Sequence, residues 1–323
     1  MLNIVIPMAG RGSRFATAGF TDPKPLIPLH GVPMIRVVID NLTPAVPHRF
    51  IFICQREHYH AYGLDSLLPQ WTENPQVVLL DGITEGAACT VLAAREFIDN
   101  DDPLMIANSD QYIAASIDAY LADMEERKLD GLIMTMTAND PKWSFASTTP
   151  DGMVTRVVEK QVISEDATVG IYNFAHGRDF VAAAEEMIAD DERVNGEFYV
   201  APVYNRMVAS QHRIGIYGIG TDGNGMHGLG TPADLAADRN AKTWWKRVTS
   251  VKVALLLHGE RRATARVAPA GYDMFGQDYS AAHASGDPGV HLLEAELAGL
   301  SGGDGARMRR LFTAVYAAGA VQP

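Results

Sequence analysis

Residues 7–15 read PMAGRGSRF and residues 23–26 read PKPL, and these two segments decide the fold of this chain. The first segment follows the short apolar run Leu2–Ile6, which predicts a buried strand. A buried strand that leads into a glycine-rich turn is typical of the first unit of an α/β fold. The segments therefore indicate such a fold, with a ligand site beyond the carboxyl end of its first strand.

The turn carries the chemistry of a polyphosphate site. Gly10 and Gly12 allow the backbone to approach a ligand closely. Arg11, Arg14 and Lys24 supply positive charge, and no acidic residue precedes position 22. Guanidinium groups and free backbone N–H groups together bind phosphate oxygens well. The sequence therefore predicts that this turn holds a phosphorylated ligand.

Two familiar phosphate-binding motifs are excluded by the spacing of these residues. A dinucleotide fingerprint needs a third glycine where Phe15 stands. A P-loop needs Gly-Lys-Ser or Gly-Lys-Thr after its spacer, and that run is absent from the turn. The turn therefore belongs to neither class.

Strand-like and helix-like segments alternate over the first two thirds of the chain. The apolar runs that predict strands are 4–7, 50–54, 77–80, 104–107 and 131–136. The patterns that predict helices are 34–42, 87–98, 116–128, 177–189 and 197–208. This alternation indicates βαβ units and a mostly parallel sheet. Residues 154–158 and 168–174 read as strands without a long helix between them, which predicts a small antiparallel insertion or a sheet edge.

The composition limits the classes of function. A chain of 323 residues with 47% apolar residues suits one large domain with an appendage. Its formal net charge of −12 argues against a nucleic-acid or anionic-membrane partner. Cys54 and Cys89 lack metal-ligand spacing and are expected to be buried thiols. No signal peptide and no membrane span is recognisable, so we expect a cytoplasmic protein.

The composition changes after about residue 243, where Gly, Ala and Arg become frequent and no isoleucine occurs. We therefore expect a first domain over residues 1–242 and a C-terminal appendage over residues 243–323. Within the appendage, 251–257 reads as a strand, 281–289 as a loop, and 289–300 and 306–319 as helices. It carries no recognisable chemistry, so packing or the formation of a homo-oligomer is its expected role.

An acidic residue follows one of the expected strands. Asp110, within Asn108-Ser109-Asp110-Gln111, comes after the apolar run 104–107. A carboxylate at the carboxyl end of a strand, in a nucleotide-binding fold, is well placed to hold Mg²⁺. The ion would bridge phosphate oxygens and offset charge that develops during a transfer. The sequence therefore predicts Asp110 as a magnesium ligand.

A second segment is suited to a flat base. Glu85-Gly86-Ala87-Ala88 opens a helix rich in small residues, against which a base can lie on the backbone. Close packing of a helix on the sheet would explain the same residues, so both interpretations stay open.

The order of Gly-x-Gly-x-Arg-Phe, Pro-Lys-Pro-Leu, the small-residue turn and the Asp after a strand resembles the signature of the sugar-phosphate nucleotidyltransferases. The resemblance covers residues 1 to about 240. It implies a Rossmann-like, GT-A-like sheet with flanking helices, Mg²⁺ as cofactor, and catalysis by Arg14, Lys24 and Asp110. It also implies that a nucleoside triphosphate is bound by Met8, Ala9, Gly10, Arg11, Gly12, Ser13, Glu85, Gly86, Ala87, Ala88 and Ser109.

The resemblance further implies an acceptor pocket in the second half of the domain. The residues that it assigns to a small phosphorylated acceptor are Glu159, Lys160, Asn173 and Glu197. Residues 228–232, GLGTP, resemble the closing motif of the family, but relatives often have Asp where Gly228 stands, as a second metal ligand. Asp222 is the substitute that we expect, and Glu197 is an alternative.

The expected reaction transfers a nucleoside monophosphate to the acceptor and releases pyrophosphate. The acceptor phosphate is already anionic, so positioning and charge neutralisation suffice and no general base is needed. A sugar 1-phosphate is the family's usual acceptor. Asn108-Ser109-Asp110-Gln111 resembles a subgroup from capsule and surface-polysaccharide clusters that includes cytidylyltransferases for head groups such as phosphocholine, which favours CTP.

Two other classes of function stay open. A glycosyltransferase of the similar GT-A fold would share the start of the chain, but such enzymes usually carry Asp-x-Asp, whereas residues 109–111 read SDQ. A non-catalytic nucleotide-binding assembly subunit would bind the nucleotide without turnover. Gly228, in place of the Asp that relatives often have, is compatible with such a subunit. Release of pyrophosphate distinguishes the predicted transferase from both.

Overall fold

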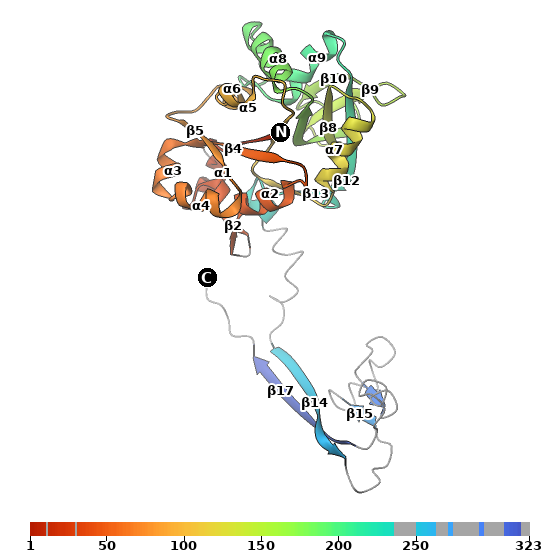
Figure 1. Ribbon diagram of the computed structural model, residues 1–323. Coiled ribbons are helices and arrows are strands. Elements are labelled where there is room, and N and C mark those ends of the chain that lie inside the picture. Colours follow the sequence, from red (N-terminus) through yellow and green to blue (C-terminus); the bar gives the residue numbers. More distant parts are fainter. Residues whose placement is uncertain are drawn as a thin grey trace. The chain divides into compact units, whose positions relative to one another are not determined.

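The computed structural model describes residues 1–10, 12–29 and 31–235, together with four strands further along the chain. The chain divides into two units, Met1–Asp238 and Arg239–Pro323. Figure 1 shows the first unit as a layered α/β body with labelled helices and strands.

A single mixed sheet forms the centre of the first unit, with the strand order β5-β4-β1-β6-β11-β8-β12-β13-β7. Strand β1 (Leu2–Pro7) pairs in parallel with β4 (His48–Gln55) and with β6 (Leu104–Ala107). Strand β5 (Gln76–Leu80) pairs in parallel with β4. The parallel pairing predicted from the alternating pattern is thus confirmed for this half of the sheet. The glycine loop follows the carboxyl end of β1, and Asp110 follows that of the neighbouring β6.

The other half of the sheet mixes strand directions. Strand β11 (Asp166–Phe174) is antiparallel to β6 and to β8 (Gly131–Thr137), whereas β12 (Ile214–Asp222) is parallel to β8. Strands β9 (Ser144–Thr148) and β10 (Val154–Glu159) form an antiparallel pair beside β11. The predicted antiparallel insertion is therefore confirmed.

The sheet ends on a return of the chain toward Asp110. Strand β13 (Gly225–Gly228) pairs antiparallel with β7 (Gln111–Ile113), and Gly228 lies opposite Gln111. A separate two-stranded pair, β2 (Pro28–Leu29) with β3 (Val32–Pro33), follows the PKPL segment. The closing motif and the strand-ending Asp, far apart in sequence, thus become neighbours.

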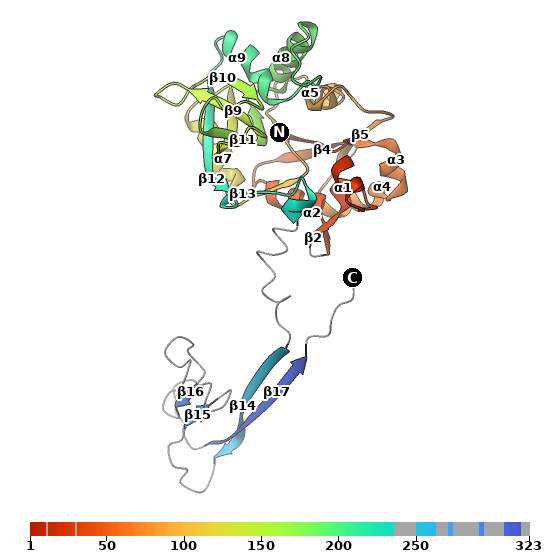
Figure 2. The ribbon, with the colours of Figure 1, turned by 180° about the vertical axis from the view of Figure 1, so that it is seen from behind.

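Helices cover both faces of the sheet (Figure 1 and Figure 2). Residues of α2 (Met34–Leu42), α4 (Leu64–Trp71) and α7 (Ile117–Glu126) belong to the core on one face. Those of α5 (Ala87–Leu92), α6 (Arg95–Ile98), α8 (Gly177–Ala189) and α9 (Tyr204–Ala209) belong to the core on the other. Both faces are buried, which explains why the central strands are continuous apolar runs. The shorter helices are α1 (Ser13–Thr17), η1 (Lys24–Leu26), α3 (Arg56–Ala61) and η2 (Ala201–Val203).

Two predicted helices differ from the structure. The predicted helix over 87–98 is interrupted after Leu92, so that α5 and α6 are separate. The predicted helix over 197–208 begins only at η2. Before it, the Phe198 backbone pairs with the Glu85 carbonyl (2.9 Å) and the Ala88 N–H (3.0 Å). These long-range hydrogen bonds keep the chain extended where the local pattern favoured a helix.

Among the described residues of the second unit, β14 (Ser250–Arg262) pairs antiparallel with β17 (Arg307–Ala317). Strand β15 (Gly271–Asp273) pairs antiparallel with β16 (His291–Leu293). The predicted strand 251–257 lies within β14 and is confirmed. The predicted helix 306–319 is wrong, because its residues pair with a distant strand. The predicted helix 289–300 contains β16 and lies otherwise outside the described residues, as does the predicted loop 281–289.

The two thiols lie in the first unit. Cys54 is buried and free, and burial raises its pKa to about 12, so it stays protonated. Cys89 is half-buried, and both burial and the nearby Glu85 carboxylate raise its pKa. The expectation of a buried thiol is thus confirmed for Cys54 and only in part for Cys89. Within the described part of the chain, no helix is both long enough and apolar enough to cross a lipid bilayer.

Candidate active site

The glycine loop is shaped by Gly12 and anchored by Phe15. Gly12 has a left-handed φ of 59°, which favours glycine. A Cβ on Gly12 would lie only 3.1 Å from Lys24 Cβ, so the glycine lets the two segments approach. Phe15 is buried in a small core with Ile27 and Leu229. The two segments that the sequence singles out, 7–15 and 23–26, are thus packed together.

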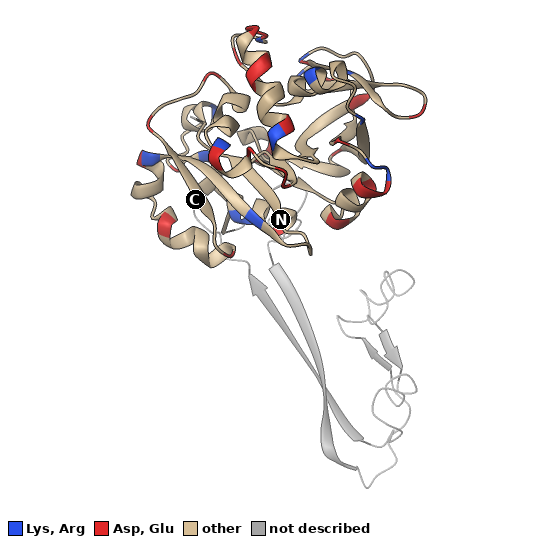
Figure 3. Ribbon diagram, turned by 45° about the horizontal axis from the view of Figure 1, so that its top comes forward, with Lys and Arg blue, Asp and Glu red and all other residues tan. Residues whose placement is uncertain are grey.

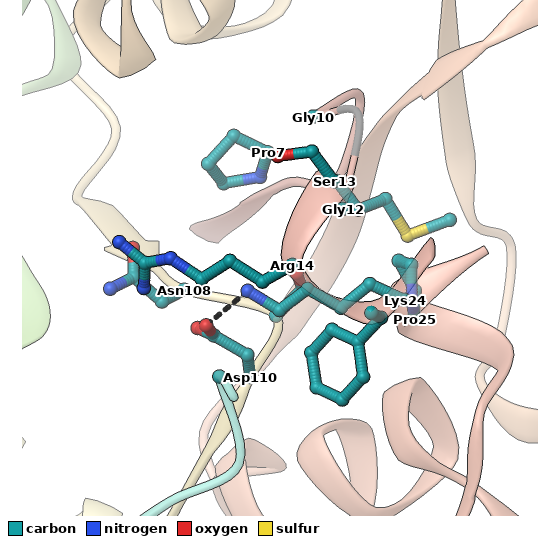
Figure 4. A pocket seen from close by; sticks show the side chains of 13 residues that line it. Pro7, Gly10, Gly12, Ser13, Arg14, Lys24, Pro25, Asn108 and Asp110 are labelled. Carbon is teal, nitrogen blue, oxygen red and sulfur yellow. Dashed lines mark hydrogen bonds and ion pairs between the residues drawn. The ribbon is translucent and has the colours of Figure 1, made fainter. Parts of the chain in front are cut away.

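A cavity of about 320 Å³ opens at this loop, and we name it the loop pocket (Figure 4). Its lining residues are Pro7, Met8, Gly10, Gly12, Ser13, Arg14, Phe15, Lys24, Pro25, Asn108, Ser109, Asp110 and Gly230. Figure 4 shows the Arg14, Lys24, Asn108 and Asp110 side chains directed into the same space. Acidic and basic residues are spread widely over the outside of the first unit (Figure 3), so the two cations gathered here are a local feature of a chain with a charge of −12.

Lys24 and Asp110 form an ion pair at the centre of this pocket, with side chains 24% and 22% exposed. The Leu229 N–H donates to the Asp110 carbonyl (2.8 Å), which brings the closing motif against the carboxylate. A Cβ on Gly230 would lie 2.5 Å from Asp110 Oδ2. Position 230 therefore accepts glycine and little else while the carboxylate keeps its place.

The donors at this point suit an ion that is held mainly by a substrate. Asp110 offers one partly exposed carboxylate beside two cations that attract phosphate oxygens. Among the described residues, no cluster of three or more His, Cys, Asp or Glu side chains could hold a metal alone. Mg²⁺ commonly binds through one or two carboxylates and substrate phosphates. The residues present therefore fit a magnesium ion that arrives with a polyphosphate.

A second cavity of about 280 Å³, the middle pocket, shares Arg14, Lys24, Asn108, Asp110 and Gly230 with the loop pocket. Its remaining lining residues are Gln111, Lys142, Trp143, Lys160, Asp222, Met226, Gly228, Thr231 and Asp234. Asp222, the predicted substitute ligand, is thus in the same cavity as Asp110. The Asp222 carboxylate lies 3.6 Å from Lys142 Nζ and is half-exposed. Asp234 instead accepts from the Thr231 N–H (2.8 Å), while the Thr231 hydroxyl accepts from the Asp234 N–H (3.2 Å) and caps the helix that begins at Pro232.

A third cavity of about 300 Å³, the side pocket, lies between the β9–β10 pair and β11. Its lining residues are Ala87, Asn108, Lys142, Trp143, Ser144, Glu159, Lys160, Thr168, Val169, Gly170, Tyr172, Tyr199, Val200 and Ala201. It shares Asn108, Lys142, Trp143 and Lys160 with the middle pocket. Glu159 and Lys160 thus meet aromatic side chains from distant parts of the chain.

Glu159 is a buried acid in the side pocket. It is 8% exposed and accepts a short hydrogen bond from the Ser144 hydroxyl. Burial raises its pKa, while the Ser144 hydrogen bond and the Lys160 charge oppose the rise. The carboxyl group is therefore buried and hydrogen-bonded rather than solvated as an ordinary surface acid.

Lys160 is fixed in an unusual conformation beside Glu159. Its φ of 56° is left-handed, and its N–H donates to the Trp143 carbonyl (3.0 Å). Its Nζ donates to the Tyr199 hydroxyl (2.5 Å) and lies 4.7 Å from the centre of that ring. The hydrogen bond to Tyr199 raises the pKa of Lys160, so the group stays cationic. The ammonium group is thereby positioned at the border of the middle and side pockets.

Several predicted site residues lie elsewhere. Asn173 is buried and lines an apolar cavity with Leu2 and Phe174, because alternation along β11 turns Gly170 and Tyr172 to the side pocket and Asn173 away from it. The structure therefore does not bring Asn173 to the side pocket. Glu197 is exposed beside Tyr199 and does not line the three pockets. Arg11 lies outside the described residues.

The segment predicted to read the base is only partly at the cavities. Glu85 pairs with Arg193 (2.5 Å), and a Cβ on Gly86 would meet the Phe198 carbonyl at 2.3 Å. Ala88 is fully buried, whereas Ala87 lines the side pocket. Ala9 is also buried and its carbonyl accepts from Gln55 (2.8 Å). Gly86 is therefore explained by close backbone packing, the alternative left open above.

Sequence reasoning missed several lining residues. Asn108 and Gly230 lie inside motifs of the sequence, but the motifs predicted no role for them. Lys142, Trp143 and Ser144 lie in no recognisable motif. A Lys-Trp pair just before a strand is a weak signal, because only the fold brings it to Glu159.

The sheet order, with a glycine loop after β1, is that of a Rossmann-like nucleotidyltransferase fold. A family model described as nucleotidyl transferase matches residues 4–201, and the chain belongs to this family. The predicted resemblance is thereby confirmed at the level of the family.

The relatives and neighbours are consistent with this. The chain is 25% identical to the bifunctional protein GlmU of Thermotoga maritima over 230 aligned residues. It is 22% identical to GlmU of Methanococcus maripaludis over 246 aligned residues. These alignments cover 68% and 74% of this chain but 49% and 54% of the relatives, so the chain spans about half their length.

Solved structures share the fold over most of their own length. A nucleoside-diphosphate-sugar pyrophosphorylase from Vibrio cholerae RC9 superposes with a TM-score of 0.63 and 25% identity, covering 72% of this chain and 98% of that one. A putative glucose-1-phosphate thymidylyltransferase from Bacillus anthracis superposes with a TM-score of 0.59 and 17% identity, covering 75% and 95%. The second match shows the fold alone.

Proposed function

We propose that the chain transfers a nucleoside monophosphate from a nucleoside triphosphate to a sugar 1-phosphate and releases pyrophosphate. The observation that carries the proposal is a continuous row of three pockets with shared lining residues. Cations line both ends of the row, Arg14 and Lys24 in the loop pocket and Lys160 in the side pocket. Two anionic substrates can therefore meet at the middle pocket.

In the proposed reaction, an oxygen of the acceptor phosphate attacks the α-phosphorus of the triphosphate. A new P–O bond forms while the bond from the α-phosphorus to the oxygen bridging the β-phosphorus breaks, and pyrophosphate leaves with that electron pair. Arg14 and Lys24 neutralise the leaving group, since cations aimed at developing charge lower the barrier. Lys160 holds the acceptor phosphate for in-line attack.

Asp110 would hold Mg²⁺ together with substrate phosphates, and the ion would supply further charge neutralisation. The Lys24–Asp110 ion pair keeps both groups in place before the substrates bind. Asp222, in the same middle pocket, is our candidate for a further ligand.

The side pocket favours a hydroxylated acceptor over a cationic one. Lys142 and Lys160 contribute two positive charges, against the single carboxyl group of Glu159. A quaternary ammonium such as that of phosphocholine would meet net repulsion there. Ser144 and Glu159 can instead accept hydrogen bonds from sugar hydroxyls, the Ser144 hydroxyl can also donate one, and Trp143 offers an apolar wall. The pocket therefore supports the sugar 1-phosphate among the acceptors that the motifs leave open.

The preference for CTP and a role in capsule or surface-polysaccharide synthesis are further proposals, which rest on the Asn108-Ser109-Asp110-Gln111 resemblance. A nucleoside triphosphate donor is compatible with the predicted cytoplasmic location. Both proposals depend on which base and which acceptor the enzyme uses.

The test is a pyrophosphate-release screen. CTP, UTP, dTTP and GTP are each combined with glucose 1-phosphate, N-acetylglucosamine 1-phosphate or phosphocholine, with and without Mg²⁺. We expect release with at least one sugar 1-phosphate and little with phosphocholine. Release only with phosphocholine would overturn the acceptor assignment. Nucleotide binding without any release would favour the assembly subunit, and cleavage of a nucleotide-sugar without release would favour the glycosyltransferase.

A further inference from the structure

Asn108 alone among the described residues lines the loop, middle and side pockets. It directly follows β6, the strand that ends at Ala107, three residues before Asp110. Figure 4 shows its side chain directed toward the space that Arg14, Lys24 and Asp110 enter. The proposed nucleotidyl transfer assigns no role to the Asn108 side chain.

The Asn108 amide is exposed and makes no hydrogen bond to any described residue, although its position is closely defined. The Asn108 backbone N–H donates to the Gly170 carbonyl (3.0 Å). A Cβ on Gly170 would lie 2.1 Å from Asn108 Nδ2, and Gly170 has a left-handed φ of 81°. The glycine therefore leaves room for this amide against β11.

A second amide lies against the same glycine. Gln111 Oε1 would be 2.9 Å from a Cβ on Gly170, and Gln111 lines the middle pocket. Gln111 is 3% exposed, and its Nε2 has no hydrogen-bond partner among the described residues. A buried donor without a partner is costly. The side-chain amides of Asn108 and Gln111 therefore offer N–H donors without partners beside Gly170.

We infer that the Asn108 side chain is a catalytic residue that hydrogen-bonds the reacting phosphates where donor and acceptor meet, an inference that rests on the proposed nucleotidyl transfer. An uncharged amide nitrogen carries two N–H donors, so it can contact one oxygen of each substrate. Such a contact aligns the attacking oxygen with the α-phosphorus. Both contacts exist only when both substrates are bound, so the gain belongs to kcat rather than to affinity for the nucleotide.

The experiment uses the full chain and the nucleotide and sugar 1-phosphate that give the highest wild-type turnover in the screen. Asn108→Ala should lower kcat by roughly 10²-fold, the scale for the loss of one preorganised donor. The Kd of the triphosphate, titrated without acceptor, should stay within about threefold, because the loop cations remain. Asn108→Asp should lower kcat further, since a carboxylate donates no hydrogen bond and repels phosphate.

Asn74→Asp is the matched control, because Asn74 is exposed between α4 and β5 and lines none of the three pockets. It introduces the same charge and should leave kcat unchanged. Equal Tm values for all variants would exclude loss of the fold.

Three results would overturn the inference. A kcat within about threefold of wild type for both Asn108 variants would remove the catalytic role. A loss confined to the Kd of the triphosphate would place Asn108 in the nucleotide site only. A wild-type chain without turnover in any pairing would remove this inference together with the proposed function, whereas active Asn108 variants would remove the inference alone.

Discussion

The loop pocket and the side pocket are built from the sequence in different ways. The loop pocket takes most of its lining from residues 7–15 and 23–25, which are near one another along the chain. The side pocket takes its lining from six separated stretches, around residues 87, 108, 143, 159, 170 and 200. A contiguous pocket leaves a readable motif, whereas a dispersed pocket exists only after the sheet has formed.

The two pockets also differ in chemistry. The loop pocket presents Arg14 and Lys24 on a glycine backbone with one carboxylate, Asp110, which suits a polyanion. The side pocket combines two lysines with a buried acid, hydroxyl groups and aromatic rings, which suits a ligand with mixed polarity. If the comparison is correct, substitutions in the two pockets should separate effects on the triphosphate from effects on the acceptor.

The largest effect is expected from Asp110→Asn in the loop pocket. The substitution preserves size and removes the carboxylate proposed to hold Mg²⁺, so turnover should fall roughly 10³-fold or more. The measurement is pyrophosphate release against Mg²⁺ concentration, with Tm as the check of folding. Asp118→Asn, in the exposed first turn of α7, is the control. Turnover of Asp110→Asn that persists in EDTA would contradict the metal role.

Arg14→Ala should have the next largest effect. Loss of a guanidinium that can bind the leaving pyrophosphate through two hydrogen bonds should lower kcat by roughly 10²-fold. Arg156→Ala, an exposed position on β10, removes the same charge away from the three pockets and should change little. Steady-state kinetics of both variants test the prediction. An Arg14→Ala enzyme within about threefold of wild type would count against the whole interpretation of the loop.

Lys160→Ala should affect the acceptor instead of the nucleotide. Loss of a charge-assisted hydrogen bond should raise the acceptor KM about tenfold, while the Kd of the triphosphate alone stays nearly constant. Lys128→Ala is a matched control, because Lys128 is also exposed and also has a positive φ, 51°. Titration with triphosphate and kinetics with varied acceptor separate the two effects. A large loss of triphosphate binding would erase the proposed division between the pockets.

The same contrast explains how much could be predicted from the sequence. Continuous apolar runs predicted the parallel strands, and periodicity predicted helices such as α2 and α8 with their observed bounds. The family followed from the motifs of the loop pocket. These features depend on residues close together in the chain, so local patterns carry them.

Features that depend on distant partners were not predictable. The segment 306–319 combines helix-forming Ala and Arg with Val, Thr and Tyr, and pairing with β14 makes it a strand. Phe198 is extended because it pairs with the Glu85–Ala88 segment. Asn173 lies on the same strand as Gly170 and Tyr172, but the alternation of side chains along β11 turns Asn173 away from the side pocket.

Glu159→Gln should give a smaller effect that depends on pH. Burial raises the pKa of Glu159 above its ordinary value of 4.5, so the folded protein keeps a proton that the unfolded chain has lost. Stability from this group is therefore present at low pH and falls as pH rises through that window. Ser144 and Lys160 oppose the shift, and Glu197 adds to it.

The measurement is the Tm of wild type and Glu159→Gln from pH 4 to 8. The variant cannot ionise, so its Tm relative to wild type should increase as pH rises. Glu126→Gln, at an exposed position, should show no such trend. A difference that decreases with pH would show that Ser144 and Lys160, rather than burial, have the larger influence on the pKa of Glu159.

The smallest effect is expected from removal of residues 243–323. Among the described residues, none beyond Asp234 lines any of the three pockets, and the family match ends at residue 201. The Vibrio cholerae structure aligns over 98% of its length with only 72% of this chain, so the shared fold needs no further segment. Both pockets should therefore stay intact, with kcat and both KM values within about threefold of the full chain. Kinetics of the truncated chain, with Tm and light scattering, test this together with any change of oligomeric state. A folded, monodisperse truncate without turnover would show that the second unit contributes to one of the pockets, and the KM that changes first would identify which one.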